Sequence, residues 1–387
     1  MGKDTKISWA THTFNPFRGC SKISEGCRNC YAEAFSGRNP SVLGVWGPNG
    51  TRVVAAEAAW KEPLKWNRAA KEAGERHRVF CASLADVFED WQGPMIDSGG
   101  QPINDADGWY SPLVERRPLT MQDVRRRLFE LIDSTPNLDW LLVTKRPENI
   151  TRMMPAKFEY DHAASCELAA SVETPVVRHN VWIGTSVENQ QAADERIPHL
   201  LKVPARVRFL SCEPLLGPVN LMQWLQAEEC EFCGPDFVHV DVEESYTIVA
   251  TGETRTGVQT YCDECPQRDP ESGSTVNSVD SPIHWVIVGG ESGSNARPMF
   301  PDWARSIRDQ CRQASGVAFH FKQWGEWQIG GSNCVAVGTD GKLCDTHGGQ
   351  LICTHPDRGH MHTLMSRVGK ENAGRILDGR TWDEVPS

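Results

Sequence analysis

Short apolar runs recur along the chain, and polar or glycine residues follow each of them. The runs are rich in β-branched and aromatic residues at consecutive positions, which is typical of strands buried on both faces of a parallel sheet. The seven runs lie at residues 7–10, 79–82, 140–143, 181–184, 207–210, 285–288 and 317–321. We therefore expect seven strands in a mostly parallel sheet.

Helix signals lie between these runs. Residues 120–134 begin with Thr120 and have Asp123 three positions later, a variant of the capping box, followed by apolar residues at helical spacing. Residues 190–201 and 302–314 also have a helical pattern. Strands that alternate with helices predict an α/β fold, either an open doubly wound sheet or a full or partial parallel barrel.

Two segments interrupt this alternation. Residues 91–118, rich in Gly, Pro and Asp, predict a long loop between the second strand and its helix. Residues 227–283 separate the fifth and sixth strands and contain two cysteine pairs, which predicts a small inserted domain. The expected division is a barrel at residues 1–226 and 284–327, an insertion at 227–283, and an irregular Cys- and His-containing extension at 328–387.

Composition narrows the class of protein. The chain has 39% hydrophobic and 24% charged residues, and no apolar run comes near the roughly 18 residues of a membrane span. A net charge of −11 argues against a protein that coats nucleic acid by bulk electrostatics. The first residues resemble neither a signal peptide nor a myristoylation signal, so we expect a cytoplasmic protein. Because the cytosol keeps thiols reduced, the 14 cysteines favour metal binding over disulfides.

The clearest chemical motif follows the first apolar run. Cys20, Cys27 and Cys30 have the spacing C-x6-C-x2-C. Three thiolates from one loop can hold three irons of a 4Fe-4S cluster and leave the fourth iron open, whereas clusters that only carry electrons usually have four cysteine ligands. Two other interpretations stay open: a zinc site with His12 as the fourth ligand, and cysteines that bind no metal.

Polar side chains follow most of the predicted strands. Functional side chains of parallel α/β barrels gather at the C-terminal ends of the strands, so these residues are candidates for ligand contacts. They are Ser83, Asp86, Lys145, Arg146, Ser186, Glu188, Asn189, Glu213, Glu291, Lys322 and Gln323. For each of them a structural ion pair or a loop cap is the alternative, and for the glycine-rich residues 289–293 a plain tight turn is the alternative.

With a three-cysteine loop directly after the first strand of a parallel α/β barrel, the chain resembles the radical SAM superfamily. The six-residue first gap is similar to that of a divergent, largely phage-encoded branch of three-cysteine-motif proteins. Further motifs of that branch lie at residues 142–147, 182–189, 211–215, 289–293 with Arg297-Pro298, and 321–325. The resemblance covers most of residues 7–327 and implies a barrel of radical SAM type.

The resemblance also implies that the open iron chelates the amino and carboxylate groups of S-adenosyl-L-methionine (SAM). Lys145 or Arg146 would then pair with the SAM carboxylate, since a guanidinium can do so with two parallel hydrogen bonds. Glu213 and Ser186 would hold the ribose hydroxyls and the amino group. The expected cofactor-binding set also includes Glu188, Asn189 and Glu291.

The function implied by this resemblance is that of a radical SAM enzyme. It would take an electron from a donor such as flavodoxin or ferredoxin and cleave SAM to methionine and a 5'-deoxyadenosyl radical. The viral context of the branch implies isomerisation or rearrangement of a modified nucleobase, for example a hypermodified thymidine in phage DNA, in the host cytoplasm if the chain is phage-encoded. The alternative is a zinc-containing DNA-binding or repair protein without SAM chemistry.

The insertion and the C-terminal extension carry further metal-binding residue types. Cys230, Cys233, Cys262 and Cys265 form two C-x2-C pairs, which predict a zinc ribbon, with a second iron-sulfur cluster as the alternative. The extension contains Cys334, Cys344, His347, Cys353, His355, His360 and His362, whose spacing matches no established pattern.

Overall fold

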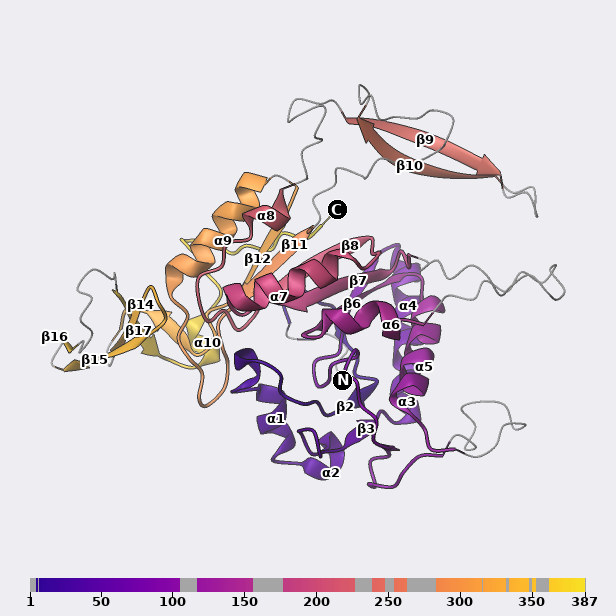
Figure 1. Cartoon of the computed structure of the whole chain (residues 1–387), viewed down its shortest axis with the longest axis horizontal. Helices are drawn as coiled ribbons and strands as arrows, with labels where there is room; N and C mark the ends of the chain where they lie inside the picture. The colour runs from indigo at the N-terminus through magenta and orange to yellow at the C-terminus, as the bar shows by residue number, and fades with distance from the viewer. Residues whose placement is uncertain are drawn as a thin grey trace.

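The centre of the protein is a curled parallel sheet that forms a half-barrel, shown in the computed structural model of Figure 1. The structure describes residues 5, 7–104, 117–155, 177–226, 239–247, 254–262, 283–314, 316–331, 334–347, 350–352 and 362–386. The seven strands are adjacent in chain order, and every neighbouring pair is parallel. They are β1 (His12–Thr13), β4 (His77–Cys81), β6 (Leu138–Thr144), β7 (Val181–Ser186), β8 (Val207–Cys212), β11 (Trp285–Gly289) and β12 (Ala318–Gln323).

Helices cover the outer face of this sheet (Figure 1). The longer ones are α4 (Glu62–Ala73), α5 (Met121–Asp133), α7 (Gln190–Leu201) and α9 (Pro301–Ala314), and the short ones are α3 (Glu57–Trp60), η2 (Pro147–Asn149), α6 (Ile150–Met153) and α8 (Met222–Leu225). Val124 and Leu128 of α5 share one buried core with Trp140 and Leu142 of β6. The expectation of an α/β fold with a partial parallel barrel is therefore confirmed, including the helices at 120–134, 190–201 and 302–314.

Aromatic side chains fill the inner face near the N-terminal ends of the strands. Trp182, Phe209 and Trp285 point to this face and form a second buried cluster, which Trp9 joins from the N-terminal segment. The Trp285 ring lies 6.3 Å from Trp9, 6.0 Å from Trp182 and 5.8 Å from Phe209 between ring centroids. Gly184 leaves room for this packing, because a Cβ there would lie 2.6 Å from the Phe209 ring. The half-barrel is thus closed with side chains at one end.

The first strand lies later than the sequence predicted. Residues 7–10 were expected to be this strand, but the pairing with β4 begins only at Thr11, whose N–H donates to the carbonyl of Arg78 at 2.8 Å. The preceding residues form a turn in which the Ala10 N–H donates to the Ile7 carbonyl. Their apolar side chains signalled burial correctly, but Trp9 is buried against the inner face of the sheet and not within a strand of its own.

A small second sheet lies beside the cysteine loop. It consists of β2 (Phe17–Arg18), β3 (Arg52–Val54) and β5 (Met95–Ile96). The segment between β2 and β3 contains η1 (Glu25–Cys27), α1 (Tyr31–Ser36) and α2 (Pro40–Leu43). The cysteines at 20, 27 and 30 therefore belong to an irregular segment that this sheet anchors at both ends.

Within the predicted insertion the structure describes an antiparallel pair, β9 (His239–Thr247) and β10 (Thr254–Cys262). The C-terminal stretch, expected to be irregular, contains a five-stranded sheet with α10 (Lys370–Ala373) after it. Its strands are β13 (Trp327–Ile329), β14 (Cys334–Gly338), β15 (Leu343–His347), β16 (Gln350–Ile352) and β17 (His362–Arg367). Among the described residues no helix is long and apolar enough to span a membrane.

Candidate functional site

The cysteine loop lies at the C-terminal ends of the strands, opposite the aromatic cluster. Cys20, Cys27 and Cys30 are partly buried, and none is in a disulfide. The loop begins at Gly19, whose φ of +109° and close approach to the Thr51 carbonyl oxygen, 2.3 Å from an added Cβ, exclude other residues. The Gly19 N–H donates to the Leu84 carbonyl at 3.0 Å, which ties the loop to the segment that follows β4.

The first cysteine lies against a buried group of charges. The guanidinium of Arg146, which follows β6, has Nη1 3.7 Å from Cys20 Sγ and 2.9 Å from the Asp86 carboxylate. Burial, Asp86 and Glu89 raise the pKa of the Cys20 thiol to about 12, and Arg146 opposes this shift. Although burial lowers the pKa of Arg146, Asp86, Cys20 and Glu89 outweigh it and raise that pKa. Arg146 therefore stays charged beside the thiol.

The middle of the loop lies against β7 and β11. A Cβ on Gly26 would lie 2.9 Å from the carboxyl carbon of Glu188, so a larger residue there would require the Glu188 carboxylate to move. Glu188 is 1% exposed and accepts hydrogen bonds from Arg196 of α7 at 2.7 and 3.2 Å. Burial raises the pKa of Glu188, but Lys145, Arg196 and Ser24 outweigh it and lower that pKa, so the carboxylate is ionised.

The far end of the loop is held by Glu291, which follows β11. Asn29 Nδ2 donates to Glu291 Oε2 at 3.0 Å and to the Asn295 carbonyl at 2.8 Å. Arg297 bonds both Glu291 and Glu25, with a distance of 2.6 Å to Glu291 Oε1. Glu291, Arg297 and Asn29 thus connect the loop to the other half of the sheet.

Four of the expected cofactor-binding residues are occupied by structural contacts. Arg146, Glu188 and Glu291 make the ion pairs described above. The Asn189 side chain is the N-cap of α7, since it accepts a hydrogen bond from the Ala192 N–H at 2.9 Å. Ion pairs and a helix cap are the alternative roles that the sequence left open for these side chains.

The other three candidates, Lys145, Glu213 and Ser186, differ from these four residues in their contacts. Within the part of the chain that the structure describes, no hydrogen bond or ion pair of the Lys145 ammonium is found, although its charge acts on Cys30 and Glu188. Glu213, after β8, accepts from the Lys322 ammonium at 2.7 Å and is one-fifth exposed. Ser186, at the end of β7, is buried, and its carbonyl accepts from Arg196.

The cysteine loop supplies three thiols as candidate metal ligands. Across the described residues no group of three or more His, Cys, Asp or Glu side chains is close enough together to hold a single metal ion. A 4Fe-4S cluster places a different iron on each cysteine, so its ligands border a common space and do not converge on a point. His12, the expected zinc ligand, instead stacks on Trp66 at 4.4 Å and bonds His77 at 3.1 Å. The donor type, three cysteine thiols, is one that iron-sulfur clusters use.

The chain matches the model of a family described as protein of unknown function (DUF5131) over residues 4–97 and 115–386. The chain belongs to this family. The cysteine loop and all expected cofactor-binding residues of this DUF5131 chain lie within the matched ranges. No curated protein and no solved structure matches the chain.

Sequence reasoning missed two buried residues of the DUF5131 chain that contact the loop. Arg52 is 0% exposed and Glu89 is 3% exposed, and they form an ion pair at 2.7 Å. Arg52 Nη2 and Glu89 Oε1 bond the hydroxyl and the N–H of Ser21, at 2.9 Å each. The available signal was an arginine next to Val53 and Val54 in a short apolar run, a position where a charge needs a partner.

The predicted metal ligands of the insertion and extension are mostly beyond the described part of the chain. Cys230, Cys233 and Cys265 lie outside it, as do Cys353, His355 and His360. Cys262 ends β10, paired with His239. In the extension, Cys334 Sγ contacts the Ser366 hydroxyl at 3.2 Å.

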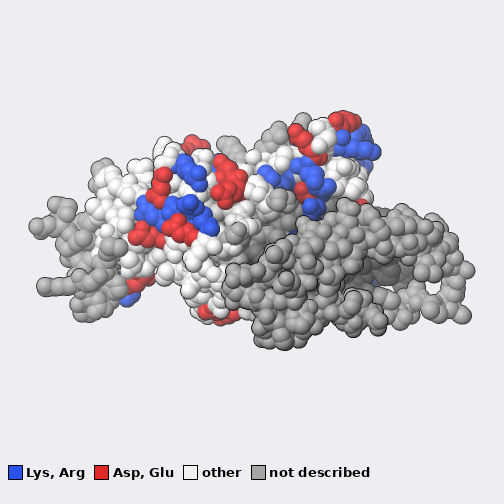
Figure 2. Space-filling view, turned by 90° about the horizontal axis from the view of Figure 1, so that it is seen from above, with Lys and Arg blue, Asp and Glu red and all other residues white. Residues whose placement is uncertain are grey.

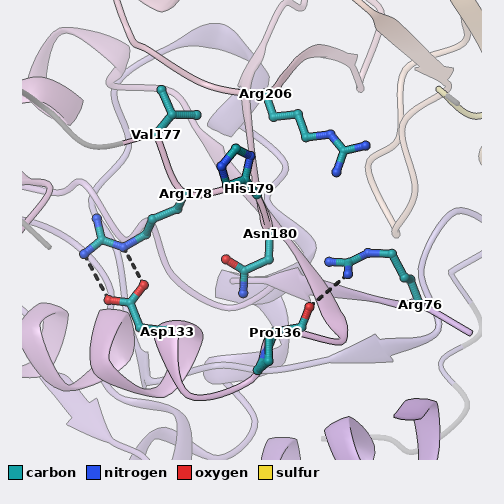
Figure 3. A pocket seen from close by; sticks show the side chains of 8 residues that line it. All are labelled: Arg76, Asp133, Pro136, Val177, Arg178, His179, Asn180 and Arg206. Carbon is teal, nitrogen blue, oxygen red and sulfur yellow. Dashed lines mark hydrogen bonds and ion pairs between the residues drawn. The ribbon is translucent and has the colours of Figure 1, made fainter. Parts of the chain in front are cut away.

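A shallow cavity of about 210 Å³ lies at the opposite end of the sheet, near the starts of β6, β7 and β8 (Figure 3). Two of its arginines already have acidic partners: Arg178 bonds Asp133 at 2.8 Å, and Arg76 bonds Asp139 at 2.7 Å. Figure 2 shows another face of the molecule. On the described residues of this face, basic and acidic side chains lie beside each other, and neither sign of charge covers a broad area. Neither feature competes with the cysteine loop as a site for chemistry.

Proposed function

We propose that the chain is an enzyme of radical SAM type, which binds a 4Fe-4S cluster through Cys20, Cys27 and Cys30. The observation that carries the proposal is the position of the loop. Three free thiols lie at the C-terminal ends of a parallel half-barrel, where barrel enzymes bind substrates, and contacts to β7 and β11 hold the loop there. Cys20, Cys27 and Cys30 would hold the cluster, and the bound cluster would supply the electron for cleavage of SAM into methionine and a 5'-deoxyadenosyl radical.

The protein side chains bind and orient the cofactor. Lys145 is the cation for the SAM carboxylate, because its charge acts on Cys30 and no hydrogen bond or ion pair of its ammonium is found among the described residues, whereas both terminal nitrogens of Arg146 contact protein atoms. Glu213, held by Lys322, and Ser186 are the polar groups for the ribose and the amino group. The aromatic cluster around Trp285 closes the other end of the half-barrel and limits access of water from that side.

The substrate proposal rests on the family resemblance of the motifs. We propose a modified nucleobase, such as a hypermodified thymidine in phage DNA, which is isomerised or rearranged. Flavodoxin or ferredoxin would supply the electron in the cytoplasm. The cysteine pairs of the insertion would bind zinc.

Anaerobic reconstitution of the full chain tests the proposal. Wild-type protein should bind iron and sulfide, develop the broad visible absorption of an iron-sulfur protein, and form 5'-deoxyadenosine from SAM with a reductant. Cys27→Ala should lose all three properties and keep any zinc in the insertion. Cys334→Ala is the matched control, because Cys334 is also a partly buried cysteine outside any disulfide but lies in β14. Colourless protein that holds only zinc and leaves SAM intact would overturn the proposal and favour a zinc-containing DNA-binding protein.

A further inference from the structure

We propose that Arg146 is a positioning residue that polarises Cys20 and thereby raises the reduction potential of the cluster. This inference rests on the proposed function, since it requires that the loop binds a cluster. It assigns Arg146 to the protein ligand of the metal and leaves the SAM carboxylate to Lys145.

The contacts of Arg146 use both ends of its guanidinium. Nη1 lies 2.9 Å from Asp86 Oδ2 and 3.7 Å from Cys20 Sγ. Nη2 donates to the Ser21 carbonyl at 2.8 Å and lies 3.6 Å from Glu89 Oε1. The residue is 7% exposed. Both terminal nitrogens of Arg146 thus contact protein atoms, which favours a role toward Cys20 over the SAM carboxylate.

A second buried arginine holds the backbone next to Cys20. Arg52 bonds Glu89 through two N–H groups at 2.7 and 2.8 Å, and its guanidinium stacks 4.1 Å from the Trp91 ring. Ser21 is bonded at its N–H by Glu89, at its hydroxyl by Arg52 and at its carbonyl by Arg146. The residue after Cys20 is therefore fixed at three polar atoms by buried charges.

Among the described residues, the sulfurs of the other two cysteines have neutral hydrogen-bond partners. Cys27 Sγ contacts the Ser24 hydroxyl at 3.7 Å, a neutral group. Cys30 accepts from the backbone N–H groups of Ala32 and Glu33. Within the described part of the chain, Cys20 is the one of the three ligands whose sulfur accepts from a guanidinium N–H, and this guanidinium belongs to a buried group of paired charges. Hydrogen bonds to cluster sulfurs and nearby charge are the main protein controls of cluster potential.

The direction in which Arg146 shifts the reduction potential follows from the charges around Cys20. Arg52 and Arg146 balance Glu89 and Asp86, so the thiolate of Cys20 is the excess negative charge in this buried group. Reduction adds a further electron to the metal that Cys20 binds. A cationic N–H donor beside the sulfur stabilises the more negative, reduced state. Loss of the Arg146 charge should make the midpoint potential more negative, and loss of the Asp86 charge should make it more positive.

The test is a redox titration of reconstituted full-length protein, followed by electron paramagnetic resonance. Arg146→Gln should keep iron and sulfide binding but shift the midpoint potential to more negative values, and Arg146→Lys should restore part of the shift. Asp86→Asn should shift it in the opposite direction, which a purely structural role would not produce. Arg152→Gln is the control, because it removes the same charge from an exposed pair with Asp90 and should leave the potential unchanged.

The outcomes separate the two proposals. A wild-type chain that binds no cluster would refute the proposed function and this inference with it. A wild-type cluster whose potential is the same in Arg146→Gln, or shifts in the same direction in Arg146→Gln and Asp86→Asn, would refute the inference alone. If Arg146→Gln fails to fold, the sign of the shift in Asp86→Asn and the partial shift in Arg146→Lys decide it.

Discussion

Each of two buried carboxylates at the site is neutralised by an arginine. Glu188 has Arg196 of α7, and Glu291 has Arg297. Removing one partner of a buried ion pair costs about 3–5 kcal/mol, because the other charge stays buried and unpaired. Such residues form the fixed wall of the site. For the Lys145 ammonium no hydrogen bond or ion pair is found among the described residues, and its charge acts on Glu188, so we propose Lys145 for the ligand contact.

The aromatic end of the half-barrel contains a buried histidine that should make stability depend on pH. His320 is 1% exposed, and its Nε2 lies 2.8 Å from the Ser8 hydroxyl. Burial lowers its pKa to about 4; Arg375, Arg78 and Lys322 act in the same direction and Asp383 opposes them. Because the folded pKa lies below the unfolded value, the unfolded state binds the proton, and stability falls as the pH drops through the range between them.

We therefore expect wild type to lose about 2 kcal/mol more than His320→Gln between about pH 7 and about pH 5. Urea unfolding at both pH values measures this difference. Glutamine can still contact Ser8 but does not titrate. An equal loss in the two proteins would show that His320 is not the group that titrates.

Among the helices and strands, the sequence predicted the features that depend on a local pattern of residues. The capping box of α5 is present as expected, with Thr120 accepting from the Asp123 N–H and the Asp123 carboxylate accepting from the Thr120 N–H. The position of β1 was wrong because an apolar run signals burial and not strand pairing. The partners of the strand-end residues could not be predicted either. Arg297 and Glu25, for example, are 272 positions apart in the chain.

The C-terminal segment is an element whose role only the structure shows. It runs along β12, the last strand of the sheet order, where the Phe321 N–H donates to the Trp382 carbonyl at 2.9 Å. The Trp382 ring is buried against Phe319, with 5.7 Å between ring centroids. Covering an edge strand in this way blocks pairing with other chains.

Trp382→Ala should therefore cost about 3–5 kcal/mol, the range for truncation of a large buried aromatic side chain. Arg380→Ala is the matched control: Arg380 stacks 3.4 Å from the same ring but is exposed, and its removal should cost below about 1 kcal/mol. Urea unfolding of the two variants compares them. Equal costs would mean that the segment does not contribute through burial of the tryptophan.

For the whole molecule, the site depends on segments that are far apart in sequence. The loop at residues 19–31 contacts residues after β4, β6, β7 and β11, so its geometry requires the assembled half-barrel. A group that binds only this assembled site stabilises the folded chain by mass action. The sequence predicted the location of the site because three cysteines lie on one loop. The sequence did not predict the Arg52–Glu89 pair beneath them, because neither residue belongs to a motif with recognisable spacing.

Cluster binding should consequently raise the thermal midpoint of the whole chain. A ligand at about 100 times its Kd adds about 2.7 kcal/mol, which for a chain of this size corresponds to roughly 3 °C. Anaerobic thermal unfolding before and after removal of iron by a chelator measures the shift. Cys27→Ala, which cannot complete the three-cysteine set, should give one midpoint under both conditions, and Cys334→Ala should behave as wild type. A wild-type midpoint that ignores iron removal would contradict coupling between the loop and the half-barrel.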